Sequence, residues 1–215
     1  LVATGSCAVH CRYCFRRHYD YGLDAGLDAA LAEIAADDSI GEVILSGGDP
    51  LTLGNRRLGD LLARLAAMAQ VRRVRMHTRT PVVLPSRVDE GLLSALAAVG
   101  ARRGRKLVVV LHANHAAEID ATLTGAIAGL ASTGATVLNQ SVLLARVNDS
   151  VEALVALSEA LFEAGALPYY LHQLDPVAGV AHFAVDDRRA RALWQGMAAR
   201  LPGYLVPRLV REIAG

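Results

Sequence analysis

The sequence predicts an α/β fold, a partial (β/α)6 TIM-like barrel, and three observations support this prediction. Short apolar runs rich in β-branched residues alternate with longer amphipathic stretches along the 215 residues. Several of the short runs are apolar almost throughout, as is typical of strands that are covered on both faces. A complete eight-unit barrel usually needs about 250 residues, so six units in this length indicate an incomplete barrel. An open, doubly wound sheet is the alternative that the same alternation allows.

Six strands and six helices are expected, and the chain is read as one domain, 1–215. The strands are expected at 1–4, 42–45, 72–77, 107–112, 136–141 and 167–172, and the helices at 24–36, 55–69, 88–99, 116–132, 150–164 and 186–200. The helix at 150–164 has the clearest ends, because residues 148–150 offer caps and Gly165 follows it. Acidic residues 186–187 suit the start of the last helix. Strands that alternate with helices pair in parallel.

Composition and charge exclude several classes of protein. With 53% hydrophobic and 20% charged residues, the chain has material for a core and is not a disordered segment. Lys and Arg number 22 and Asp and Glu 21, so the net charge of +1 gives no electrostatic case for a nucleic-acid partner. No apolar run reaches the roughly 18 residues that span a bilayer, and no secretory signal is visible. We therefore expect no membrane partner and a cytoplasmic location.

Polar residues collect directly after the expected strands, and four of them are histidines. They are Cys7, Cys11 and Cys14 after the first strand, 46–49 after the second, His77, Thr78 and Arg79 after the third, His112, Asn114 and His115 after the fourth, Asn139, Gln140 and Ser141 at the end of the fifth, and His172, Gln173 and Asp175 after the sixth. Loops are polar in any case, but this explains Ser and Asp better than it explains histidines. In parallel α/β folds the carboxyl ends of all strands open on one face, where ligands bind. The sequence therefore predicts a ligand site on that rim.

The three cysteines form a C-x3-C-x2-C motif within eight residues, Cys7 to Cys14. An odd number of cysteines without an export signal does not indicate disulfides. Three thiolates at this spacing suit one [4Fe–4S] cluster whose fourth iron has no protein ligand. Two alternatives remain: a structural zinc site completed by His10 or His18, and unligated thiols. Structural zinc more often uses two separated ligand pairs, and none is visible.

The cysteine motif, with aromatic Tyr13 before its last cysteine, resembles the radical S-adenosylmethionine (SAM) superfamily. This resemblance implies a barrel of the radical SAM type, in which Cys7, Cys11 and Cys14 hold the cluster and SAM binds the open iron. The stretch Ser46-Gly47-Gly48-Asp49 is similar to the glycine-rich motif of that superfamily, which contacts SAM. An ordinary tight turn between a strand and a helix is the alternative for this stretch.

Four separated segments narrow the resemblance to lysine 2,3-aminomutases, and most closely to the branch that makes (R)-β-lysine for modifying elongation factor P. They are 11–18, 43–51, 138–144 and 168–172. The resemblance implies an isomerase that uses the cluster, SAM and pyridoxal phosphate. A 5′-deoxyadenosyl radical from SAM would take hydrogen from Cβ of lysine held by pyridoxal phosphate, and the nitrogen would move from Cα to Cβ. It further implies an electron donor such as a flavodoxin or a ferredoxin, and an assembly of identical subunits.

The resemblance also carries site roles to individual residues. Arg16 matches the arginine that pairs with the substrate carboxylate, and Asp175 and Glu212 match the acids that hold the ε-ammonium, although Glu212 stands where better-known members carry Asp. Tyr13, His112 and Gln140 are expected to line the cofactor cavity. The alternatives are a solvated arginine, a turn aspartate before Pro176, a surface glutamate paired with Arg211, and core hydrogen bonding for His112 and Gln140. His10 and His18 are expected on the surface.

No catalytic residue of this family is expected within the chain itself. The lysine that anchors pyridoxal phosphate in the family is expected just after Gly215, and the only lysine present, Lys106, precedes the fourth strand, at the end opposite the rim. We therefore expect a fragment of a longer protein that lacks an N-terminal segment and the lysine segment. Such a fragment is expected to bind the cluster and SAM, but pyridoxal phosphate only weakly.

Two other functions remain open at this stage. One is a different radical SAM reaction, such as an aminomutase acting on arginine or glutamate, or an activity without pyridoxal phosphate. A pair of carboxylates at Asp175 and Glu212 suits a cationic side chain and disfavours glutamate. The other is a non-catalytic iron–sulfur or zinc-binding module, which would form no 5′-deoxyadenosine.

Overall fold

The computed structural model describes residues 1–14, 16, 26–101 and 104–212, and within them seven parallel strands form one sheet. The strands are β1 (Val2–Thr4), β2 (Glu42–Gly47), β3 (Arg73–Thr78), β4 (Lys106–His112), β5 (Thr136–Val142), β6 (Leu167–His172) and β7 (Arg208–Val210). The α-helices are α1 (Leu27–Ala36), α2 (Asn55–Ala67), α3 (Thr80–Val83), α4 (Glu90–Gly100), α5 (Ala121–Ser132), α6 (Val151–Glu163) and α7 (Asp187–Ala198). Short 3-10 helices are η3 (Pro50–Thr52), η4 (Pro85–Arg87), η5 (Ala116–Glu118), η6 (Ala181–Phe183) and η7 (Gly203–Leu205).

The strand order identifies the fold as a partial barrel. The strands are neighbours in chain order, β1 to β7, and each pair is parallel. A doubly wound sheet reverses its strand order at a switch point, and this sheet does not. Among the described residues β1 and β7 each pair with one strand only, so the barrel is not closed. The predicted fold class is confirmed, with a seventh strand beyond the six expected.

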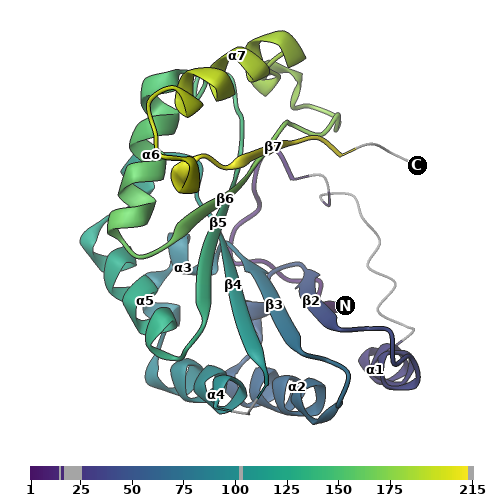
Figure 1. Cartoon of the computed structure of the whole chain (residues 1–215). Helices are drawn as coiled ribbons and strands as arrows, with labels where there is room; N and C mark the ends of the chain where they lie inside the picture. Colours follow the sequence, from purple (N-terminus) through teal and green to yellow (C-terminus); the bar gives the residue numbers. More distant parts are fainter. Residues whose placement is uncertain (15, 17–25, 102–103, 213–215) are drawn as a thin grey trace.

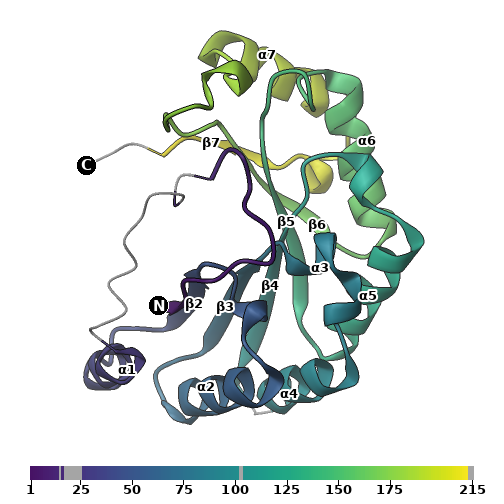
Figure 2. The same cartoon turned by 180° about the vertical axis from the view of Figure 1, so that it is seen from behind.

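The helices lie along the outer face of the curved sheet, and the apolar core fills the space between. Figures 1 and 2 show α2, α4, α5, α6 and α7 following one face of the fan of strands. The larger core joins the outer face of β2–β5 to α2, α4, α5 and α6, and a smaller one packs β6 against α6 and α7. Because strand side chains alternate between faces, the residues next to these core positions point into the barrel.

The alternation of side chains between the two faces of β3 and β6 shows which residues face the inside of the barrel. Met76 of β3 and Leu171 of β6 are buried in the outer core, so His77 and His172, which follow them, face inward. Further from the rim, two residues before His77, Arg75 contacts Glu42 of β2 (3.1 Å) and donates to the hydroxyl of Tyr169 (3.5 Å). The floor of the barrel is therefore polar, and its charges are paired.

The predicted elements mostly match, and the differences have local causes. The predicted helix 116–132 is two elements, η5 and α5, because the carboxylate of Asp120 accepts from the N–H of Leu123 and starts a new helix. Ser150 caps α6 as expected, and Gly165 follows it with a φ of 94°. The helix expected at 24–36 begins at Leu27, and residues 24–25 lie outside the described part. Lys106 is the first residue of β4, at the end opposite the rim.

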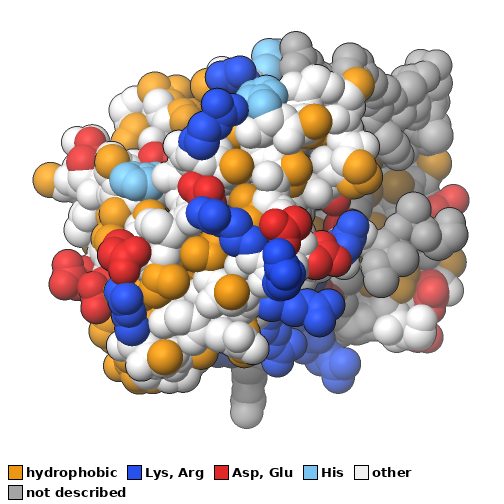
Figure 3. All heavy atoms as spheres, turned by 90° about the horizontal axis from the view of Figure 1, so that it is seen from above, with side chains coloured by type: hydrophobic (Ala, Val, Ile, Leu, Met, Phe, Trp, Pro, Cys, Tyr) orange, Lys and Arg blue, Asp and Glu red, His pale blue; other side chains and the backbone are white. Residues whose placement is uncertain are grey.

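The surface carries intermingled charges. Figure 3 shows basic and acidic side chains lying next to one another on the face seen from above. Three of the ion pairs involve α7 or its flanks: Arg189–Asp149, Arg200–Glu152 and Arg211–Asp187. In the part of the chain that the structure describes, no helix is both long enough and apolar enough to span a bilayer.

Candidate functional site at the carboxyl ends of the strands

The loop after β1 carries the three cysteines and is held against the end of β2. The N–H of Gly48 donates to the carbonyl of Thr4 (2.7 Å), and the N–H of Asp49 donates to the carbonyl of Ser6 (2.7 Å). A Cβ on Gly47 or Gly48 would collide with the backbone of this loop, and Gly47 has a φ of 116°. The two glycines thus permit a contact between backbones that no side chain allows.

The three thiols are half-buried close to one another. Cys14 N–H donates to the carbonyl of Cys11 (3.2 Å), which forms a turn between them. Burial is the largest of the causes that raise the pKa of the Cys7 thiol. The charges of Asp49, Cys14 and Cys11 raise that pKa further. Thiolates placed this close repel one another, and a bound cation or cluster removes that repulsion.

The donor set fits an iron–sulfur cluster better than zinc. Three soft thiol ligands lie on one loop at the mouth of the barrel, as a site for a small cluster requires. Within the described ranges, no three His, Cys, Asp or Glu side chains are already arranged around one point as metal ligands. His10 is exposed, as expected, and His18 lies outside the described residues.

Asp49 joins the loops after β2 and β3. Its Oδ1 accepts from Leu51 N–H (3.0 Å) and Thr78 Oγ1 (2.7 Å), and its Oδ2 accepts from the N–H groups of Arg79 (2.7 Å) and Thr80 (2.9 Å). Four donors occupy a buried carboxylate that has about four acceptor positions. The side chain therefore fixes the glycine turn in place, whereas the resemblance to radical SAM proteins had suggested a contact with the cofactor.

Tyr13, between the second and third cysteines, is the centre of a polar network. Its hydroxyl oxygen accepts from Arg79 Nη1 (3.1 Å) and Asn114 Nδ2 (2.5 Å), and it also bonds with Nε2 of His112 (3.1 Å). The Tyr13 and His112 rings stack with centroids 5.7 Å apart. Glu118 completes the network by accepting from Arg79 Nη2 (2.6 Å) and from Asn114 N–H (2.6 Å). This network ties the cysteine loop to the end of β4.

His112 and Gln140 lie side by side on the inner face. They are register partners at the ends of β4 and β5. Burial lowers the pKa of His112 to about 3, and the charge of Arg79 and the rings of His172 and His77 act in the same direction. The imidazole is therefore neutral at physiological pH. Asn139, the neighbour of Gln140, points the other way and bonds with the N–H of Ala113 (2.8 Å).

Arg16 reaches the end of β2. Its Nη1 donates to Ser46 Oγ (2.7 Å) and to the Gly47 carbonyl (3.0 Å). These bonds hold the guanidinium at the mouth of the barrel, beside the glycine turn. Ser46 and Gly47 therefore bind the guanidinium of Arg16 directly.

Asp175 and Glu212 lie within electrostatic range of each other although 36 residues separate them in the chain. Burial raises the pKa of Asp175, and the charge of Glu212 raises it further, whereas His172 lowers it. Strand β7 explains the proximity, because it pairs with β6 and carries Glu212 to the loop that holds Asp175. Arg211 pairs with Asp187 (2.6 Å). A cavity of about 510 Å³ opens beside Asp175, lined mainly by residues 173–178, 180–181 and 184–185.

Several residues of this site were not assigned a role from the sequence. Arg79 and Asn114 were noted only as polar residues near strand ends, and Glu118 was not singled out. Their position after β3 and β4 was the available signal, but the sequence does not reveal that their side chains meet at Tyr13.

Comparisons with known proteins find relatives that are named lysine aminomutases. No family model matches. An L-lysine 2,3-aminomutase of Escherichia coli K12 is 46% identical over 219 residues, and one of Haemophilus influenzae is 44% identical over 218; both matches cover 100% of this chain and 63% of the relative. The chain is homologous to L-lysine 2,3-aminomutases. It spans less than two thirds of the length of these relatives.

Solved structures agree on the fold of this aminomutase homologue. Streptococcus suis SuiB, also solved bound to S-adenosylmethionine, matches 98% of the chain with a TM-score of 0.64 at 14% identity, covering 48% of its own chain. A radical SAM methyltransferase from Sphaerobacter thermophilus matches 98% with a TM-score of 0.61 at 19% identity, covering 64% of its own chain. This lysine aminomutase homologue therefore shares its partial-barrel fold with these two proteins.

Removing the Asp49 carboxylate is expected to destabilise the fold strongly. Asp49→Ala leaves several buried donors unsatisfied, each costing about 1–3 kcal/mol, so we expect a total loss of about 3 kcal/mol or more in the free energy of unfolding. Urea unfolding measures this. The control Asp89→Ala removes a more exposed helix cap and should cost about 1 kcal/mol. Equal losses in the two variants would contradict the role assigned to Asp49.

Protonation of His77 is expected to destabilise the fold in acid. Burial lowers the pKa of His77 to about 4, with Arg75, His172 and Arg16 adding to the effect. The unfolded state, with a pKa near 6.5, binds a proton first, so stability falls as the pH drops from about 6.5 to 4. Unfolding of wild type and His77→Gln at pH 7 and pH 4.5 tests this. The variant should lose less stability; identical losses would show that His77 does not contribute.

Proposed function

We propose that this chain is the radical SAM barrel of an L-lysine 2,3-aminomutase, which converts (S)-α-lysine to (R)-β-lysine. The observation that carries the proposal is that Asp175 and Glu212 lie within electrostatic range of each other after the paired strands β6 and β7, in a chain homologous to these enzymes. A half-buried carboxylate at Asp175 within electrostatic range of the exposed Glu212 suits an ammonium group between them. The glutamate alternative is disfavoured, because its side-chain carboxylate would meet the same charge.

The cysteine loop supplies the ligands for the first cofactor. Cys7, Cys11 and Cys14 would hold a [4Fe–4S] cluster, and their half-buried positions at the barrel mouth support this assignment. The glycine turn, Tyr13, His112 and Gln140 border the adjoining space for SAM. When bound, cluster and SAM supply a 5′-deoxyadenosyl radical, and pyridoxal phosphate holds the migrating nitrogen.

The residues of the barrel orient the substrate at both ends. Arg16, anchored by Ser46 and Gly47, is proposed to pair with the lysine carboxylate, since a guanidinium suits two-point binding of a carboxylate. Asp175 and Glu212 are proposed to take the ε-ammonium. Lys106 begins β4 at the far end of the barrel, so its amine is not positioned to anchor pyridoxal phosphate at this site.

The partners follow from the same proposal. One-electron chemistry needs a low-potential donor of the flavodoxin or ferredoxin type. The segments that resemble the elongation factor P branch support (R)-β-lysine as a product used to modify that factor.

The cluster assignment has a direct chemical test. Anaerobically reconstituted full-length protein should form 5′-deoxyadenosine and β-lysine from SAM and L-lysine when dithionite is present. Cys11→Ser should lose most of the bound iron and all of this product, because one of three ligands is gone. His10→Ala should keep both iron and activity. Iron retention in Cys11→Ser together with iron loss in His10→Ala would favour a different metal site.

The acid pair is expected to control substrate affinity. Asp175→Asn removes one charge-assisted contact, worth about 1.5–3 kcal/mol, so KM for L-lysine should rise about tenfold or more. The matched control Asp187→Asn alters an aspartate that lines the same cavity but pairs with Arg211. Its KM should change less than about twofold. Unchanged KM in Asp175→Asn would remove this residue from the binding site.

A further inference from the structure

An ion pair between Arg79 and Glu118 adjoins the cysteine loop, and the proposed function gives it no role. Arg79 follows β3, and its Nη2 donates to a carboxylate oxygen of Glu118 on η5 at 2.6 Å. The two side chains are 21% and 25% exposed, so the pair is largely shielded from water. Charges in such a place are screened less than charges on the surface. The pair can therefore act on whatever the neighbouring thiols hold.

The ion pair has its positive end toward the cysteine loop. Arg79 Nη1 donates to the hydroxyl of Tyr13 at 3.1 Å, and Tyr13 directly precedes Cys14 in the chain. Glu118 uses its other oxygen to accept from the N–H of Asn114 (2.6 Å), at the loop that leads into η5. On the pKa of Tyr13, the charge of Arg79 has a larger effect than that of Glu118. Arg79 is therefore the nearer of the two charges to the loop.

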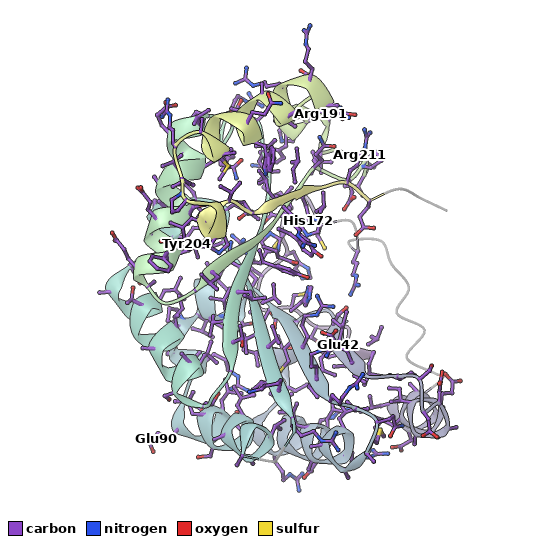
Figure 4. All side chains as sticks on the ribbon, in the orientation of Figure 1. Glu42, Glu90, His172, Arg191, Tyr204 and Arg211 are labelled. Carbon is purple, nitrogen blue, oxygen red and sulfur yellow. The ribbon has the colours of Figure 1, made fainter. Side chains whose placement is uncertain are left out.

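The guanidinium of Arg79 has a fixed position. The backbone N–H of Arg79 donates to Asp49 Oδ2 (2.7 Å), and Nη1 also donates to the carbonyl of His112 at the end of β4 (2.9 Å). These bonds direct the side chain to β4 and η5. The acids proposed to hold the ε-ammonium instead follow β6 and β7, where Figure 4 labels His172 and Arg211. The charge of Arg79 is thus separate from the proposed substrate contacts.

The charge of Arg79 reaches the cysteine loop through neutral neighbours. Burial raises the pKa of the Tyr13 hydroxyl and lowers the pKa of His112 to about 3, so both side chains are uncharged at physiological pH. Burial also raises the pKa of the Cys11 thiol, and the charge of Arg79 opposes that rise. A cation that favours negative charge on the Cys11 sulfur also favours negative charge on a cluster bound through that sulfur.

We propose that Arg79, held in place by Glu118, makes the iron–sulfur cluster easier to reduce. This inference rests on the proposed function, in which the three thiols hold a [4Fe–4S] cluster. Reduction takes one electron from a low-potential one-electron donor, adds one negative charge to the cluster, and forms or breaks no bond. The fixed cation stabilises the reduced state more than the oxidised state, and Glu118 opposes this effect from further away. Nearby charges and hydrogen bonds to the sulfurs are known to set cluster potentials.

The test is a redox titration of the anaerobically reconstituted full-length protein without SAM or substrate. The electron paramagnetic resonance signal of the reduced cluster is the readout, and iron and sulfide are counted first. Arg79→Gln removes the positive charge, Arg79→Lys keeps it, and Glu118→Gln removes the negative charge. The matched control Arg87→Gln removes an arginine of similar burial, 15% exposed, that donates to the carbonyls of Leu51 and Leu53.

The two members of the pair are expected to change the potential in opposite directions. Arg79→Gln should shift the equilibrium about tenfold toward the oxidised cluster, which lowers the potential by about 59 mV for one electron. Arg79→Lys should keep most of the wild-type potential. Glu118→Gln should shift the equilibrium about threefold toward the reduced cluster, because the charge that opposes Arg79 is gone. Arg87→Gln should stay within about twofold of wild type.

The sign of each shift separates an effect of charge from a displacement of the loop. Unchanged potentials in Arg79→Gln and Glu118→Gln overturn the inference, and so do shifts of the same sign. If Arg79→Gln loses its iron, Glu118→Gln decides: a higher potential supports the inference, and a potential at or below wild type overturns it. Where wild type holds the cluster, such a failure leaves the aminomutase proposal standing. A wild-type protein that holds no cluster overturns both.

Discussion

The structure depends on one close approach between backbones, that of Gly47 and Gly48 to the loop that follows β1. Two N–H···O bonds of 2.7 Å join the segments, and a Cβ at either glycine would meet backbone atoms of Thr4 or Ser6. Because β1 has only three residues, this contact contributes much of what positions the cysteine loop. Asp49 then fixes the glycine turn to the start of α3. The proposed cluster ligands are therefore positioned by the same turn that we propose to border the SAM site.

The second organising feature is the distribution of charge inside the barrel. Arg16 is anchored at β2, whereas Asp175 and Glu212 lie at the ends of β6 and β7. Parallel strands in sequential order bring all of these ends to one rim, so residues distant in the chain reach the rim where we propose the substrate site. A molecule with a carboxylate at one end and an ammonium at the other matches this arrangement.

The sequence predicted the repeating units well and the meeting of side chains poorly. Strand β6 was predicted at its observed bounds because its apolar run ends in polar residues, but β7 has only three residues, too few for a period to be recognised. Glu212 was assigned from resemblance alone, and β7 supplies the physical reason for its position. The bonds of Tyr13 with Arg79 and Asn114 join residues 66 and 101 positions apart. Local patterns carry no information about such contacts.

The central claim is that three thiols at the barrel mouth hold a cluster with one iron left open for SAM. Mössbauer spectra of the anaerobically reconstituted full-length protein, recorded with and without SAM, test this claim most directly. The account predicts that one iron site of the cluster changes its isomer shift when SAM is added, while the other three stay unchanged. Spectra that do not respond to SAM, or that show every iron held by the protein, would contradict it.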